Sequence, residues 1–178
     1  DGRWRGYHDF DSGAKLLDWG AHTLDLCQWA CGQDGSMPVE WEPQHVPGDN
    51  VIHGRYGNGV KVVLRKSGWL GLGTCPIRLE GTDGWIETGD SGRLAVSNDR
   101  LRGELPTPAD AGTIPWKHVR DFFDCVKTRG QTRANANVMR SSHLACHMAA
   151  ISWILGRKVL VDPAKEVFIG DDQANRMC

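Results

Sequence analysis

The spacing of apolar residues predicts three long helices. Residues 12–31 are almost continuously apolar; Asp11 or Ser12 can cap their first turn, and Gly32 suits the position after the helix end. Residues 116–128 repeat apolar side chains at i, i+3, i+4 and i+7, namely Val119, Phe122, Phe123 and Val126. Residues 137–155 form the third helix, closed by Gly156. A short fourth helix is expected to begin at Asp171 or Asp172.

Elsewhere the polarity alternates with the period of two that is typical of β-strands. The predicted strands are residues 39–41, 51–56, 60–65, 77–80, 85–88, 94–97 and 158–161. Gly57-Asn58-Gly59 and Gly81-Thr82-Asp83-Gly84 indicate hairpin turns, because glycine and asparagine readily take positive φ. Strands joined by tight turns pair antiparallel. We therefore expect an α+β fold, largely one antiparallel β-sheet with helices packed on one face, and a proline-rich loop at residues 103–115.

The composition excludes several classes of protein. The 178 residues are 40% hydrophobic and 24% charged, which fits one folded domain rather than a disordered chain. The net charge of -1 predicts no nucleic-acid partner, and the lack of a polybasic stretch or a long apolar run predicts no membrane partner. No signal peptide is visible, but this absence says little because the chain starts at Asp1 and not at Met, which suggests a fragment. A cytoplasmic protein is expected.

The cysteines and tryptophans suggest packing more than chemistry. The six cysteines are scattered without a C-x-x-C pair, so we expect reduced, mostly buried thiols and no disulfide framework. The eight tryptophans fit either a thick core, which we favour, or a cleft that holds the flat faces of sugar rings. His143 and His147 have the i, i+4 spacing of a zinc-binding pair, but no third ligand is obvious, so no metal site is predicted.

The first helix carries the clearest candidate chemistry. One stripe of this apolar helix is mainly ionisable, and its members are Lys15, Asp18, His22, Asp25 and Trp29. Asp18 and His22, at i and i+4, are close enough to touch, and a carboxylate beside an imidazole suits proton transfer to or from a hydroxyl or carbonyl. On spacing alone, an ordinary polar helix face is the better interpretation. Asp25 can be structural, bonded to the backbone or to Lys15.

Two further features lie next to this helix. The polar, aromatic segment with Arg3, Trp4, Arg5, Tyr7 and His8 either reaches over a sugar or is a plain surface arm. Trp19 either packs in the core, which we favour, or borders the cleft.

Several motifs resemble one enzyme family. The run Ser12–Gly32 resembles the G-G-x-L-x-D-x-G-x-H-x-x-D-x-x-x-W-x-x-G helix of the glucose-fructose oxidoreductase/inositol dehydrogenase (Gfo/Idh/MocA) family. The run from Glu80 to Ile86 is similar to its E-G-T-x-G hairpin, and His118–Lys127 to its late helix. Leu155–Lys158, Asp162-Pro163 and Asp171–Arg176 resemble the C-terminal signature of a bacterial subgroup. The matches follow in order along nearly the whole chain.

The resemblance implies a two-domain enzyme in which residues 1–178 are the C-terminal domain, which holds the substrate and forms a homo-oligomer through its sheet. Its pattern places Asp18 and His22 at the active site, with His22 as acid/base and Asp18 orienting His22 or holding a hydroxyl. We expect Lys15, Trp19, Arg5 and Tyr7 to contact the substrate. NAD or NADP would be bound mainly by an N-terminal Rossmann domain that this chain lacks.

This sequence also departs from the family's pattern. It has neither a glycine-rich dinucleotide fingerprint nor a Glu-Lys-Pro segment, so no cofactor-binding residue is predicted here and the chain alone is expected to be inactive. The expected function is that of the substrate domain of an oxidoreductase acting on a sugar or polyol by hydride transfer. The alternatives are a non-catalytic oligomerisation or sugar-binding module, and a glycoside hydrolase or lyase that uses NAD and a transient keto sugar.

Overall fold

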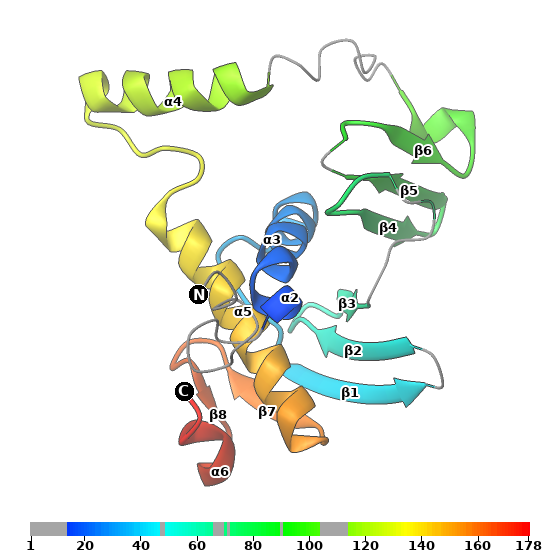
Figure 1. Ribbon diagram of the computed structural model, residues 1–178, viewed down its shortest axis with the longest axis vertical. Helices are drawn as coiled ribbons and strands as arrows, with labels where there is room; N and C mark the ends of the chain where they lie inside the picture. The colour runs from blue at the N-terminus through cyan, green and yellow to red at the C-terminus, as the bar shows by residue number, and fades with distance from the viewer. Residues whose placement is uncertain (1–13, 47–48, 66–69, 71, 90, 104–113) are drawn as a thin grey trace, which may run out of the picture. The chain divides into compact units, whose positions relative to one another are not determined.

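The computed structural model describes residues 14–46, 49–65, 70, 72–89, 91–103 and 114–178. The chain divides into a main unit, residues 1–66 and 137–178, and an inserted unit, residues 67–136. Helices and two antiparallel sheets make an α+β fold, as the sequence predicted (Figure 1). The predicted caps Asp11 and Ser12 and the arm with Arg5 and Tyr7 lie outside the described residues.

The main unit is built on a five-stranded antiparallel sheet with the order β3-β2-β1-β7-β8. Its strands are β1 (Glu40–Val46), β2 (Asp49–Arg55), β3 (Lys61–Leu64), β7 (Val159–Asp162) and β8 (Val167–Phe168). The predicted turn between β2 and β3 is confirmed, since Gly59 has a φ of 91° and its N–H donates to the carbonyl of Tyr56 at 2.9 Å. Strand β1 is longer than the predicted residues 39–41 because it pairs along its whole length with β2, from Glu40↔Arg55 to Val46↔Asp49.

The inserted unit has its own three-stranded sheet, so the prediction of a single sheet is wrong. Its strands are β4 (Ile77–Gly81), β5 (Gly84–Thr88) and β6 (Leu94–Val96). Tight turns specify which neighbours in sequence pair, but they do not specify which hairpins share a sheet. In the main unit the place beside β1 is taken by β7, through the pair Trp41↔Val159.

A buried carboxylate organises one face of this small sheet. Glu87 on β5 is fully buried, and its Oε1 accepts the backbone N–H of Leu70 at 2.7 Å. Its Oε2 lies 3.9 Å from Nη1 of Arg78, whose guanidinium sits 4.1 Å from the centre of the Trp85 ring. A buried charge is tolerated when it is paired and hydrogen-bonded. Glu87 thus ties the backbone of Leu70 to the sheet.

The helices agree with the sequence prediction except at one point. They are α2 (Ala14–Leu17), α3 (Trp19–Ala30), α4 (Ile114–Thr128), α5 (Ala136–Leu155) and α6 (Asp172–Asn175), with a 3₁₀ turn at Asp99–Leu101. The expected continuous helix over residues 12–31 is instead interrupted at Asp18. Gly32 and Gly156 follow the ends of α3 and α5 with φ near 65°, as predicted.

Helices α3 and α5 pack with the inner face of the five-stranded sheet into one core (Figure 1). These two helices contribute Ala21, Leu24, Ala145, Cys146, Met148 and Ala149, α2 adds Leu17, and the strands contribute Trp41, Ile52, Val62, Val159, Val161 and Phe168. Of the tryptophans that the structure describes, only Trp41 is fully buried. The core explanation for the tryptophan content therefore holds for Trp41 and not for Trp19, Trp29 or Trp116, which are exposed.

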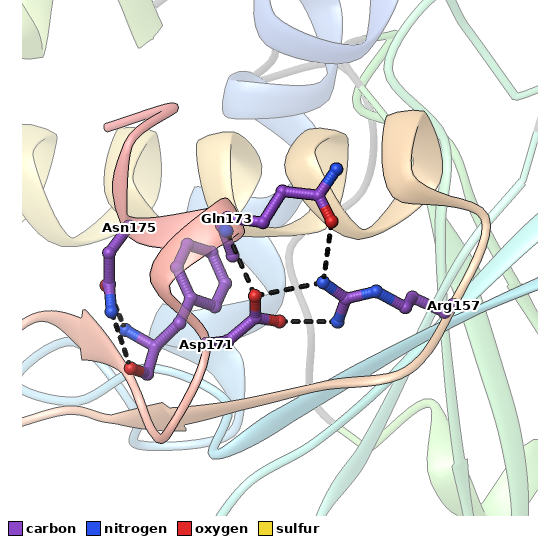
Figure 2. A network of polar contacts seen from close by, with 6 residues as sticks. Arg157, Asp171, Gln173 and Asn175 are labelled. Atoms are coloured by element: carbon purple, nitrogen blue, oxygen red, sulfur yellow. Dashed lines mark hydrogen bonds and ion pairs between the residues drawn. The ribbon is translucent and has the colours of Figure 1, made fainter.

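Polar contacts fasten the C-terminal segment to the main unit (Figure 2). Asp171 caps α6 by accepting the N–H of Ala174 at 3.0 Å, as the sequence predicted, and its carboxylate also pairs with Arg157 in the turn after α5. The side-chain amide of Asn175 both accepts from the N–H of Phe168 at 2.8 Å and donates to its carbonyl at 2.9 Å. Asn175 thereby satisfies the backbone N–H and carbonyl of Phe168, which a neighbouring strand would otherwise have to pair.

A second polar cluster joins three strands at the start of β1. Glu40 accepts two hydrogen bonds from Arg55, at 2.9 and 3.0 Å, and pairs with Lys158 at 2.9 Å. The hydrogen bonds from Arg55, and then that from Lys158, lower the pKa of Glu40 from 4.5 to about 2. The ionised form is therefore favoured in the folded state.

This cluster predicts a pH dependence of stability. Because the folded pKa of Glu40 is depressed, its contribution is complete above the unfolded value of 4.5 and is lost as the pH falls towards 2. We expect Glu40→Gln to lower the free energy of unfolding at neutral pH and the difference from wild type to vanish near pH 2. Urea unfolding across this range measures it, with Glu42→Gln on the same strand as the control. A difference that stays constant down to pH 2 would contradict the assignment.

Candidate functional site

The interruption between α2 and α3 places Asp18 at the start of the site helix. Asp18 occupies the N-cap position of α3, is half-buried, and makes no side-chain capping hydrogen bond there. A carboxylate at a helix N-terminus is favoured by the positive end of the helix dipole. The backbone of Asp18 keeps right-handed helical angles, φ −75° and ψ −76°. Asp18 therefore lies at the junction between α2 and α3, four residues before His22.

His22 lies one turn into α3 with its side chain exposed. Its ring faces that of Trp19, with 5.9 Å between ring centroids and an angle of 47° between the planes. Trp19 is 45% exposed, so the favoured prediction that it packs in the core is wrong. The neighbouring positions on the buried side are taken by the smaller Ala21 and by Leu24, which fill the core instead. An imidazole and an indole therefore stand side by side on an accessible helix surface.

The two sides of α3 differ in burial. Leu17 on α2 and Ala21, Leu24 and Gln28 on α3 are buried, whereas Trp19, His22 and Trp29 are exposed. Of the predicted stripe, His22 and Trp29 are therefore exposed, whereas Asp18 and Asp25 are half-buried. A polar group that is kept accessible on such a helix is a reasonable place for a ligand.

Asp25 has a defined structural partner that its sequence position did not reveal. Its Oδ1 accepts a hydrogen bond from the hydroxyl of Ser142 on α5 at 2.7 Å. Ser142 is buried, and its hydroxyl also lies 3.2 Å from the carbonyl of Val138. The two residues are 117 positions apart, so no local pattern could have paired them. The expectation that Asp25 is structural fits this contact, with a partner from another helix.

The remaining predicted substrate-binding residues are only partly visible. Arg5 and Tyr7, with the rest of their arm, lie outside the described residues. Lys15 belongs to α2, but its side chain also lies outside them. The described part of the candidate site therefore consists of Asp18, Trp19 and His22, with Asp25 one turn further along α3.

The cysteines of this region are suited to packing. All six cysteines are free, but only Cys75 and Cys146 are buried and Cys31 and Cys178 are exposed, so the prediction of mostly buried thiols is wrong. Burial raises the pKa of Cys27 on α3 and of Cys146 on α5 to about 12, so both thiols stay protonated near neutral pH. A protonated, buried thiol is a poor nucleophile and a poor metal ligand. These residues do not add covalent chemistry to the site.

Metal binding has no support among the residues that the structure describes. They contain no group of three or more His, Cys, Asp or Glu side chains placed to hold an ion. His143 and His147 are both exposed on α5, and burial together with the charge of His143 lowers the pKa of His147. Without a further ligand they remain two histidines on a helix surface.

A dinucleotide does not fit the described residues. Its phosphates need a glycine-rich turn that leads from a strand into a helix N-terminus. Here Gly59 lies between β2 and β3, and Gly84 opens β5 opposite Gly81 on β4. Gly170 does lead from β8 towards a helix, but it is a single glycine and α6 has only four residues.

The described residues thus form an α+β fold that carries an aspartate and a histidine on an accessible helix. Residues 1–178 match the family model described as "Oxidoreductase family, C-terminal alpha/beta domain". The chain belongs to this family, Gfo/Idh/MocA, as the motifs indicated. The comparison with curated proteins found no match. Within the described part of the chain, no helix has both the length and the apolar character that crossing a bilayer requires.

Proposed function

We propose that this chain is the substrate domain of an NAD(P)-dependent oxidoreductase that interconverts a hydroxyl and a carbonyl on a sugar or polyol. The observation that supports the proposal best is the accessible Asp18, Trp19 and His22 surface on α3, in a domain of an oxidoreductase family. An indole beside polar groups suits a carbohydrate ring, which has both apolar faces and hydroxyls. The prediction that residues 1–178 act together with a separate Rossmann domain is part of this proposal.

In this proposal each residue has one task. His22 accepts the proton of the reacting hydroxyl during oxidation and returns it during reduction. Asp18 orients the imidazole or holds a neighbouring hydroxyl of the substrate. Trp19 packs against the ring of the substrate, while Lys15, Arg5 and Tyr7 are proposed as further contacts. A nicotinamide held outside these residues supplies the hydride chemistry.

The proposal is tested on the protein in which this chain is joined to its dinucleotide-binding domain. A panel of polyols and sugars is incubated with NAD⁺ or NADP⁺, and formation of the reduced nicotinamide is followed. Oxidation of at least one polyol or sugar is expected, with the isolated 178-residue chain inactive. A binding or oligomerisation module would give sugar binding without turnover. A hydrolase or lyase would form product while the amount of reduced nicotinamide stays constant.

We further propose that the domain forms a homo-oligomer through the outer face of the five-stranded sheet. On this face three apolar side chains on β7, on β8 and just after β8 are exposed: Leu160 (45%), Val167 (39%) and Ile169 (56%). Leu160 and Ile169 lie opposite each other, since the N–H of Ile169 donates to the carbonyl of Leu160. Exposed apolar neighbours of this kind are commonly covered by a second subunit.

Charges placed on this surface should separate the subunits. We expect Leu160→Glu combined with Ile169→Glu to convert the oligomer to a monomer, because burying two carboxylates at an interface is costly. Light scattering coupled to size-exclusion chromatography measures the mass, and circular dichroism checks the fold. Thr82→Glu, in an exposed turn of the inserted unit, is the control. An unchanged mass of the folded double variant would place the interface elsewhere.

A further inference from the structure

The contact between Asp25 and Ser142 is a short polar link between two apolar helices. Asp25 on α3 is half-buried, Ser142 on α5 is 3% exposed, and their oxygens are 2.7 Å apart. A hydrogen bond to a carboxylate acceptor is among the stronger ones in proteins. Leaving the carboxylate half-buried without this donor would carry a desolvation cost. The link therefore has one favoured geometry.

Apolar packing by itself specifies the rotation of α3 only weakly. Besides its buried Ala21 and Leu24, the helix carries apolar or aromatic residues on its other sides, including Trp19, Leu26 and Trp29. Helix α5 likewise exposes the apolar Met139 and Ile154, next to the polar His143 and His147 on its outer side. When two such helices pack, several rotations bury comparable area. A single buried polar pair can then select one of them, as it does in coiled coils.

The rotation of α3 controls where the candidate site residues point. Asp25 is three residues after His22 and seven after Asp18, so it lies about 4.5 and 10.5 Å further along the helix axis. A side-chain tip about 5–6 Å from the axis moves by about 3 Å when the helix turns by about 30°. Displacements of about 1 Å can lower a reaction rate about 100-fold. A fixed rotation is therefore required for precise proton transfer by His22.

We propose that Ser142 is a positioning residue for the reaction: its hydrogen bond to Asp25 locks the rotation of α3 and so aims Asp18 and His22 at the substrate. This inference rests on the proposed function for its catalytic part, while the locking of α3 is a property of the fold. Ser142 does not itself contact the substrate. It acts from α5 through the carboxylate of Asp25.

The first test uses Ser142→Ala in the protein joined to its cofactor domain. We expect kcat to fall about 10- to 100-fold with a smaller change in KM, because the substrate still binds but the reacting groups are misaligned. Ser142→Thr keeps a hydroxyl donor and Asp25→Asn keeps an acceptor oxygen, so at least one of them should stay within about threefold of wild type. If both conservative variants lose as much as Ser142→Ala, the hydrogen bond is not the cause.

The second test detects a change in the rotation of α3 without an activity assay. It measures the alkylation rate of each cysteine separately, peptide by peptide. Cys27 on α3 is half-buried and Cys31 at the end of the helix is exposed, so Cys31 is the reference for reagent access. In Ser142→Ala we expect Cys27 to react at least threefold faster. Cys146, which is fully buried on α5, should stay protected, because a loss of fold would expose it as well.

The outcomes of the two tests separate the inference from the proposed function. Faster alkylation of Cys27 with Cys146 protected supports the lock, and a parallel fall in kcat supports its role in positioning. An unchanged Cys27 rate overturns the inference, whatever the activity. Exposure of Cys146 in Ser142→Ala would also overturn it, because Ser142 would then stabilise the fold as a whole. If the wild-type protein oxidises no polyol or sugar, the proposed function fails, and alkylation alone still decides whether Ser142 locks α3.

Discussion

Replacing His22 by alanine is expected to lower kcat/KM for sugar or polyol oxidation by about 10²- to 10⁴-fold in the protein joined to its cofactor domain. General acid–base catalysis by one side chain contributes about this much. The loss should fall mainly on kcat, because alanine removes the proton acceptor but leaves Trp19 and Asp18 to hold the substrate. His22 is exposed, so the substitution should leave the fold unchanged. Steady-state kinetics with the best substrate from the panel measures the effect.

The matched control for this prediction is His143→Ala. His143 is also an exposed histidine on a helix of the main unit, but it lies on α5 and outside the candidate site. We expect its kcat/KM to stay within about twofold of wild type. Equal losses in the two variants would mean that His22 has no special role. An unchanged kcat/KM in His22→Ala would remove it from the mechanism.

Replacing Trp41 by alanine is expected to cost about 3–5 kcal/mol of unfolding free energy, the usual range for a large aromatic lost from a core. Trp41 is fully buried on β1, the central strand of the five-stranded sheet. Trp29→Ala is the matched control, because Trp29 is 67% exposed at the end of α3; its change should stay within about 0.5 kcal/mol. Urea unfolding at neutral pH measures both. A loss below about 1 kcal/mol for Trp41→Ala would contradict the described core.

The glycine opposite Trp41 supplies an independent check of the same packing. A Cβ on Gly54 would lie 2.6 Å from Cζ3 of Trp41 and 2.8 Å from Cγ1 of Val62. Gly54→Ala should therefore destabilise the fold by about 1–3 kcal/mol through overpacking. Combined with Trp41→Leu, which vacates part of that space, the loss should be smaller than the sum of the two single losses. Simple additivity would mean that Gly54 and Trp41 do not touch.

The parts of the fold that could be predicted from the sequence are those fixed by local rules. Gly32 and Gly156 end α3 and α5 because a positive φ is needed there, and Asp171 caps α6 with its own side chain. The turns at Gly59 and Gly84 follow from the same freedom of glycine. Each of these features depends on residues within one turn of one another. The periodicity of the helices belongs to the same class.

The parts that could not be predicted depend on contacts between distant residues. Strand β8 has two residues, too few for any alternation, and exists because Val161 pairs with Phe168. The separation into two sheets follows from β7 taking the place beside β1, although most of the chain lies between these two strands. The sequence did not predict the second half of β1 because the run from Glu42 to His45 has no apolar alternation. These residues are nevertheless in a strand because they pair with β2. Such choices are made by the tertiary structure and not by local preference.

The candidate site shows the same division. The helical spacing of Asp18 and His22, together with the family's motif, is sufficient to predict that both lie on the same side of the site helix. The exposure of Trp19 was misjudged, because on a helix that is apolar all round the sequence does not say which aromatic residue is buried. Nothing in the sequence around Ser142 indicated a role for this residue. Its importance emerges only from its contact with Asp25, on a different helix.

The most direct test of the central claim is isotope transfer to the cofactor. The protein joined to its dinucleotide-binding domain is incubated with NAD⁺ or NADP⁺ and with polyols or sugars deuterated at their hydroxyl-bearing carbons, and the reduced nicotinamide is analysed by mass spectrometry. We predict that deuterium appears in the nicotinamide for at least one substrate with the wild-type protein and with His143→Ala, and that its rate of appearance falls at least about 100-fold in His22→Ala. No deuterium transfer from any of these substrates, or equal transfer by His22→Ala, would contradict the account.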